Sequence, residues 1–325
     1  MEGWISYAIS LLTVGGIYAV VALGLNVQWG FTGLFNAGIA GFFAIGAYVS
    51  AILTTPPSPD HLGGFELPVA VGWLAAMVAA GLLAWLVGVV CIRLRSDYLA
   101  IATIGIAEIL RLVLKNELWL TNGPRGIQRI PRPFEELGQP WADVAYLGLV
   151  AAAVLVLFLM LQRASRSPWG RTMRAIREND VAAEAMGKNV VRFRLEAFVV
   201  GGMLMGLGGA MQAHLTKFIG IDATEPMMTT FLVWVMLIVG GSGNNLGAVV
   251  GPLLIWVLWS ATELVTGQLP PDWTTRAAYI RVFLIGLLLQ VVLQRHAHGL
   301  FPERRPQPAP RAAAPAADAG QGTAA

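Results

Sequence analysis

Glu108 and Arg111 are the residues whose types and spacing most directly suggest chemistry. They stand three positions apart in a largely apolar segment, residues 97–114, and this spacing places both side chains on one face of a helix, where they can form an ion pair. Ionisable residues inside a membrane are costly to bury unpaired and mark substrate or ion pathways. The pair is therefore either a pathway site or a structural ion pair near the outer interface, with Arg111 reaching toward water.

The arrangements that carry enzymatic chemistry are missing. The sequence has no GxxxxGK[ST] phosphate loop and no HExxH motif, and no Ser/His/Asp or paired-carboxylate arrangement stands out within the apolar segments. The single cysteine, Cys91, leaves no cysteine metal cluster, and the four histidines are scattered. We therefore expect no enzymatic activity, no cofactor and no metal. If ATP drives this protein, another chain must hydrolyse it.

Two glycine-rich stretches each lead into asparagine: Gly30–Gly33 with Asn36, and Gly240–Gly243 with Asn244 and Asn245. Matching interruptions in two halves of a transporter indicate a binding site near the membrane midplane. The functional interpretation is that both stretches break helices, and that Asn36, Asn244 and Asn245 line a pathway. The simpler interpretation is close helix packing, which small-xxx-small spacing permits. That spacing occurs at Gly202/Gly206 and Gly243/Gly247/Gly251.

A charged loop, residues 163–194, lies between two strongly apolar runs and holds eight of the 22 lysines and arginines. Its first part predicts a helix with arginines on one face and apolar residues on another, namely Arg171, Arg174 and Arg177 against Met173 and Ile176. Asn179 or Asp180 can cap a second short helix, which Gly187 would end. Its small apolar face suits a groove on a soluble partner and consists of Ala182, Ala183, Ala185 and Met186. The alternative is a solvated loop whose basic residues only mark the cytosolic side of the membrane, but its length and two-helix pattern exceed what that role needs.

The composition defines the elements that must position these residues. With 56% hydrophobic and 13% charged residues and a mean hydropathy of +0.64, the chain is expected to be an all-α polytopic membrane protein. A helix needs roughly 20 apolar residues to cross a bilayer. By that criterion we predict nine spans, with eight to ten as the range because 97–114 and 228–241 are short enough to be re-entrant or half-helices. The predicted spans are 5–25, 35–53, 68–91, 97–114, 143–162, 195–214, 228–241, 246–266 and 278–294.

The basic residues predict the orientation. Alternate threading of nine spans places fourteen lysines and arginines on the side of the 163–194 loop and six on the other, so the loop is expected to be cytosolic. The N-terminus is then outside, or inside if one short segment does not cross. Because the basic residues stand at the ends of spans rather than in an aromatic-interleaved patch, nucleic acid is not an expected partner. Residues 301–325 are rich in proline and alanine and are expected to form a disordered cytosolic tail on a permease domain of residues 1–300.

The loop and the helix that follows it, SPWGRTMRAIRENDVAAEAMGKNVVRFRLEAFVVGGMLMGLGGAM, resemble the branched-chain amino acid permease subunits of ABC importers (LivH/LivM family), particularly the LivM type. The resemblance extends to LNVQWGFTGLFNAGIAGFFAIGAY, to residues 93–127 and to residues 235–255. It implies the ABC importer permease fold in a bacterial inner membrane. It also implies a coupling element that meets the ATPase and comprises Asp180, Ala182, Ala183, Glu184, Ala185, Met186 and Gly187.

The resemblance also implies an assembly in which a second homologous permease, two ATPase subunits and a periplasmic binding protein work with this chain. The substrates would be branched-chain amino acids, with other small amino acids, amides or urea left open. The alternative is a stand-alone secondary transporter or channel, in which Glu108 would titrate or pair along an ion pathway. That alternative predicts several intramembrane charges in register, whereas the spans offer essentially one acid with a base beside it, and Arg281.

Overall fold

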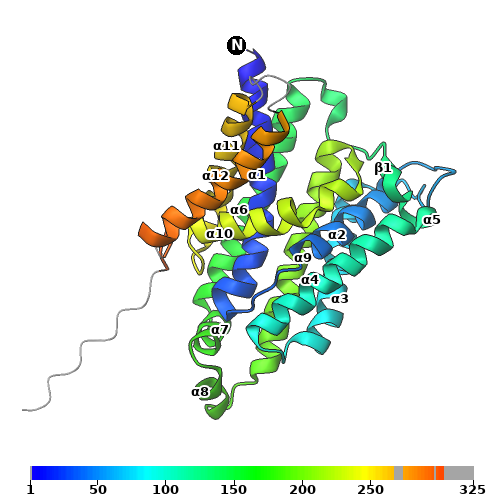
Figure 1. Ribbon diagram of the computed structural model, residues 1–325. Coiled ribbons are helices and arrows are strands. Elements are labelled where there is room, and N and C mark those ends of the chain that lie inside the picture. Colours follow the sequence, from blue (N-terminus) through cyan, green and yellow to red (C-terminus); the bar gives the residue numbers. More distant parts are fainter. Residues whose placement is uncertain (1, 267–273, 296–297, 304–325) are drawn as a thin grey trace, which may run out of the picture.

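The computed structural model describes residues 2–266, 274–295 and 298–303, and these form a bundle of long helices (Figure 1). Each of the nine predicted spans coincides with a helix. The long helices are α1 Glu2–Leu25, α2 Ile39–Thr54, α3 Val69–Cys91, α4 Ser96–Asn116, α6 Trp141–Arg166, α9 Val190–Thr216, α10 Leu232–Gly240, α11 Asn245–Thr266 and α12 Thr274–Arg295. Single π-helical turns extend two of them, Asn26–Phe31 after α1 and Met227–Phe231 before α10.

Shorter elements connect the long helices. The short α-helices are α5 Leu118–Thr121, α7 Pro168–Glu178 and α8 Asp180–Ala185, and the 3-10 turns are Gly123–Arg125, Glu135–Leu137 and Ile221–Thr224. In the described residues the strands are limited to β1 Ile127–Gln128 and β2 Phe218–Ile219, which pair antiparallel. The predicted all-α class is therefore confirmed.

Four helical stretches of the described chain are long and apolar enough to cross a membrane: Gly3–Phe31, Val69–Cys91, Trp141–Arg166 and Asn245–Glu263. Three shorter apolar helices join them, Ile39–Thr54, Thr229–Gly240 and Val282–Arg295. The 16 residues of α2 span only about 24 Å at 1.5 Å per residue, less than the roughly 30 Å hydrocarbon core. Such a helix must tilt, or begin inside the protein at an interruption of the chain.

Helix α9 is the central element, and it packs against α1, α2 and α3. Its small residues let neighbouring backbones approach closely. A Cβ atom added at Gly46 of α2 would lie 2.0 Å from the carbonyl oxygen of Gly206, and one added at Gly209 would lie 2.0 Å from that of Phe43. The packing interpretation is thus confirmed for Gly206, which also faces α3, where its added Cβ would lie 2.4 Å from the Cβ of Ala80.

The two short helices α7 and α8 lie at the end of the molecule opposite the N-terminus (Figure 1). This placement agrees with the predicted threading, which puts the N-terminus and the 163–194 loop on different sides. The outermost part of the loop is α8, and the loop then leads back into α9.

Candidate functional site

Both ends of α8 are capped as the sequence predicts. The Asn179 side-chain oxygen accepts a hydrogen bond from the Ala182 N–H at 2.9 Å, so Asn179 is the N-cap. At the other end Gly187 has a φ of +75°, a conformation that glycine adopts without a Cβ penalty. The N–H of Gly187 bonds to the carbonyl of Glu184 at 2.8 Å and that of Lys188 to Ala183 at 3.1 Å, which forms a Schellman motif. Asp180, the other cap candidate, instead pairs with Arg194 at 3.1 Å.

One side of α8 anchors it and the other side is open. Ala183 is buried in a small apolar cluster with Ile176 of α7 and Val190 of α9. Val181 and Met186 are 73% and 79% exposed, and the remaining predicted coupling residues, Ala182, Glu184, Ala185 and Gly187, are also exposed. The exposed apolar face of α8 therefore contains Val181 but not Ala183, because Ala183 packs α8 against α7 and α9.

Helix α7 connects this face to the membrane helices. Its predicted apolar side is buried, with Met173 and Ile176 at most 1% exposed. Of the predicted arginine face, Arg177 reaches the first interruption: it donates hydrogen bonds to the carbonyl oxygen of Gly30 and to the Glu303 carboxylate at 2.6 Å. Arg174 donates to the carbonyl of Ser165 at 3.0 Å.

Both predicted helix interruptions are present. The chain leaves its π-helical turn at Phe31 and resumes as α2 at Ile39, and it leaves α10 at Gly240 and resumes as α11 at Asn245. The two interruptions touch each other, since a Cβ atom added at Gly30 would lie 2.6 Å from the Gly243 nitrogen. The interruptions lie at the loop end of the molecule rather than midway through the membrane. The helical stretch before the first one has 29 residues and is about 43 Å long, which is more than the roughly 30 Å hydrocarbon core.

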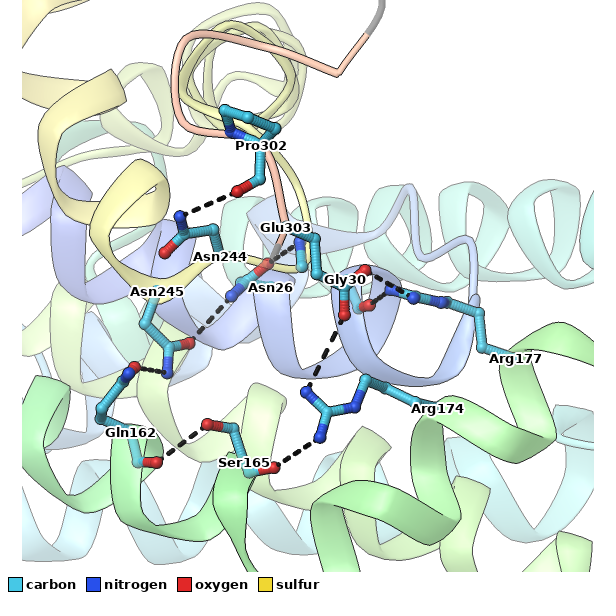
Figure 2. A network of polar contacts seen from close by, with 11 residues as sticks. Asn26, Gly30, Gln162, Ser165, Arg174, Arg177, Asn244, Asn245, Pro302 and Glu303 are labelled. Atoms are coloured by element: carbon cyan, nitrogen blue, oxygen red, sulfur yellow. Dashed lines mark hydrogen bonds and ion pairs between the residues drawn. The ribbon is translucent and has the colours of Figure 1, made fainter. Parts of the chain in front are cut away.

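Amide side chains hold the interruptions together (Figure 2). The Asn26 side-chain oxygen accepts from the Gly243 N–H at 2.8 Å, and its amide nitrogen donates to Asn245 at 3.0 Å. Asn245 in turn donates to Gln162 of α6 at 3.1 Å. Because Arg174 binds the Ser165 carbonyl one turn away on α6, these contacts form a polar network that joins α6, α7 and both interruptions.

The three asparagines predicted to line a pathway all take part in these interruptions. Asn36 is buried, donates to Gln28 at 2.8 Å and accepts from the Gly38 N–H at 2.8 Å. The Asn244 side-chain oxygen accepts from the Leu246 N–H at 2.9 Å at the start of α11. Together with Asn245, these side chains satisfy polar groups where the helices break.

A cavity of about 540 Å³ lies next to the first interruption, between α4, α10 and the start of α2. Its walls are almost wholly apolar, and they include Phe35, Ala37, Ala107, Phe231, Trp234 and Ile238. Glu108 is the one charged residue among the described residues that line it. The predicted pairing with Arg111 is confirmed, with bonds of 2.6 and 2.9 Å, and the two side chains are 42% and 29% exposed.

Sequence reasoning missed Asn26, Gln28, Gln162 and Glu303; Gln28 binds Asn36, and the other three belong to the polar network. The first three are amides at the loop-side ends of apolar runs, a position that could have marked them as helix-end partners. Glu303 falls in the predicted disordered tail, residues 301–325. The structure places Phe301–Glu303 against α10 and α7. Residues 304–325 lie outside the described residues; they include Arg304, Arg305 and Arg311, three of the fourteen basic residues assigned to the loop side.

Comparison with known proteins gives the family. The sequence model of the family described as "Branched-chain amino acid transport system / permease component" matches residues 7–293. The high-affinity branched-chain amino acid transport system permease protein LivM of Escherichia coli (strain K12) is 32% identical, covering 92% of this chain and 71% of the relative. A probable LivM permease of Methanocaldococcus jannaschii is 24% identical over 89% of this chain and 91% of the relative.

Another relative is named for a different substrate. The guanosine ABC transporter permease protein NupQ of Bacillus subtilis (strain 168) is 26% identical, covering 74% of this chain and 76% of the relative. No solved structure matches the chain significantly. The matches to the family model and to LivM, together with the helical fold, show that this chain belongs to the family of permease components of branched-chain amino acid transport systems, the membrane subunits of ABC transporters whose ATP is hydrolysed by separate subunits.

Proposed function

We propose that this chain imports branched-chain or closely related small amino acids across the inner membrane as one of two homologous permease subunits. Two ATPase subunits drive the transport, and a periplasmic binding protein delivers the substrate. The family assignment supports an ABC permease in a complex with ATPases. The substrate class, the binding protein and the docking role of α8 are part of the proposal.

The observation that carries the proposal is the contact between the loop and the chain segment that leads into the cavity wall. Arg177 of α7 binds the Gly30 carbonyl, and the chain runs from Gly30 directly to Phe35 and Ala37, which line the cavity. A displacement of α7 therefore acts on backbone that ends in the cavity wall.

The loop is built to move as one piece. Because Ala183 of α8 is buried against Ile176 of α7, force applied to the exposed face of α8 is transmitted to α7. Closure of the ATPases would press on Val181, Ala182, Ala185 and Met186. The arginine face of α7 would then shift the interrupted segments and alternate access to the cavity.

The cavity suits an aliphatic amino acid. Its apolar walls offer about 0.8 kcal/mol for each methylene or methyl group that leaves water. Glu108 places a carboxylate at the cavity wall, which matches the ammonium group of an amino acid, and Arg111 pairs with it on the same helix. We infer that Asn36, Asn244 and Asn245 shape this pathway by fixing the helix interruptions rather than by contacting substrate through free side chains.

The stand-alone transporter is the weaker alternative. A proton or ion pathway needs several charged residues in register, but Glu108 is the only acid among the described residues that line the cavity, and it is already paired. A secondary transporter would also leave the exposed, doubly capped α8 without a partner.

The test is a pull-down of the subunit in mild detergent with mass spectrometry, followed by uptake assays on the reconstituted complex. We expect a P-loop ATPase pair and a second permease to be recovered, and to be lost when Val181–Gly187 is replaced by a Gly/Ser linker. Uptake is then measured with leucine, isoleucine, valine, urea and guanosine. Recovery of the subunit alone, under conditions that preserve a known importer, would contradict the proposal, and preferred uptake of guanosine would reassign the substrate.

A further inference from the structure

The residues after α12 bind the second helix interruption through their backbone. The N–H groups of Leu300 and Phe301 donate to the carbonyls of Val239 and Gly240 at 2.9 and 3.0 Å. These carbonyls lie in the last turn of α10, where the helix leaves them without internal partners. Residues 298–303 therefore complete the end of α10.

The fit between the two segments is too close for a side chain. A Cβ atom added at Gly299 would lie 2.5 Å from the Cα of Gly241, and one added at Gly241 would lie 2.3 Å from the carbonyl oxygen of Phe301. The Asn244 side chain adds a hydrogen bond to the Pro302 carbonyl at 3.3 Å. Residues 298–303 are thus held along the whole length of the second interruption.

Glu303 then connects this segment to the loop (Figure 2). Its carboxylate lies 2.6 Å from Arg177 and 3.9 Å from Arg174. All three side chains are largely shielded, with exposures of 16%, 23% and 25% for Glu303, Arg177 and Arg174. Charge-assisted bonds between partly buried groups are stronger than those of solvated pairs, and without the carboxylate the two guanidinium groups would repel each other.

We propose that residues 298–303 are a strap that transmits movement of the loop to the second interruption, with Glu303 as a positioning residue. The same guanidinium of Arg177 binds Gly30, in the π-helical turn that leads into the first interruption, and Glu303 of the strap. Glu303 thereby fixes Arg177 at the point where it acts on both interruptions together. This proposal rests on the proposed import function, because the strap would take part in driving import.

The experiment compares the full-length complex containing Glu303→Gln with the wild type and with Glu136→Gln as a matched control. Glu136 is exposed in the 3-10 turn before the start of α6, whereas α7 follows the end of that 26-residue helix. The readout is the number of substrate molecules taken up per ATP hydrolysed. Loss of one charge-assisted bond predicts a ratio about tenfold lower for Glu303→Gln, with partial recovery in Glu303→Asp and no change in Glu136→Gln. A Glu303→Gln ratio within twofold of the wild type would overturn the strap.

A second readout does not depend on the transported substrate. The strap shields Arg174 and Arg177, so trypsin should cut after these residues about tenfold faster in the Glu303→Gln complex than in the wild type. An unchanged cleavage rate would overturn the strap. Failure of the wild-type complex to take up any branched-chain amino acid would instead count against the proposed function, and the cleavage rate would still decide whether Glu303 holds the loop.

Discussion

Arg177 in the charged loop of residues 163–194 donates a hydrogen bond to the backbone carbonyl of Gly30, a residue 147 positions earlier in the chain. Gly30 lies in the π-helical turn that precedes the first helix interruption. A guanidinium group serves several acceptors at once through its fixed fork of N–H groups, and here it serves a carbonyl and a carboxylate. The contact makes α7, rather than α8 alone, the part of the loop that reaches the membrane helices.

Arg177→Lys is expected to uncouple ATP hydrolysis from uptake while leaving the complex assembled. Lysine keeps the charge but lacks the fork that binds Gly30 and Glu303 together. We expect uptake per ATP to fall roughly five- to tenfold, as for the loss of about one charge-assisted bond. Arg171→Lys is the matched control, since Arg171 is exposed and binds only a neighbouring carbonyl, that of Arg166, among the contacts described. Equal ratios for the two variants would contradict the role of Arg177.

Substitutions on α8 should separate docking from folding. Val181→Asp with Met186→Asp places two charges on the exposed face, and we expect loss of ATPase association at an unchanged melting temperature. Ala183→Asp buries a carboxylate in the cluster with Ile176 and Val190, which costs several kcal/mol, so this variant should lower the melting temperature. Pull-down and thermal unfolding of the solubilised subunit measure the two effects. ATPase association that survives the double substitution would rule out α8 as the docking element.

The sequence predicts the helices well because hydropathy and span length are local properties. All nine segments and both caps of α8 follow from local patterns, and so does the Glu108–Arg111 pair at i, i+3. Contacts between distant segments do not follow. Nothing local indicates that Glu303 meets Arg177, or that the buried His214 joins Ser50 at 2.8 Å and the Pro131 carbonyl at 2.6 Å. The alanine pattern of α8 likewise cannot show which alanine faces inward, because that depends on where α7 lies.

Gly46→Ala should destabilise the subunit through the contact of α2 with α9. The added Cβ would lie 2.0 Å from the carbonyl oxygen of Gly206, so the two backbones must separate, at a penalty of about 1–3 kcal/mol for overpacking. Gly105→Ala in α4 is the control, because nothing lies within 4 Å of its added Cβ and alanine favours a helix by about 1 kcal/mol. Thermal unfolding in detergent should therefore move in opposite directions for the two variants. A Gly46→Ala subunit as stable as the wild type would show that α2 can move away from α9 without loss.

Deletion of residues 306–325 is expected to leave uptake unchanged. The deleted segment begins after Glu303, so the contacts of the strap with α10 and α7 remain. Its Pro/Ala-rich composition provides few large apolar residues to stabilise other contacts. Uptake by the shortened and full-length chains in the same vesicles measures the effect. A large loss of uptake would show that this segment takes part in transport.

Exchanging Glu108 and Arg111 decides whether their ion pair serves the substrate pathway or only stabilises α4. Glu108→Gln leaves Arg111 without its carboxylate partner, and because both side chains are partly exposed, the loss of stability should stay below about 1 kcal/mol. Leucine uptake should fall about tenfold if the carboxylate at the cavity wall receives the substrate's ammonium group.

The double variant Glu108→Arg with Arg111→Glu restores an ion pair but puts the positive charge at the cavity wall, where it repels that ammonium group. We therefore expect the exchange to restore the melting temperature and not the uptake. Recovery of both would show that the pair only stabilises α4, and the pathway role would then be wrong.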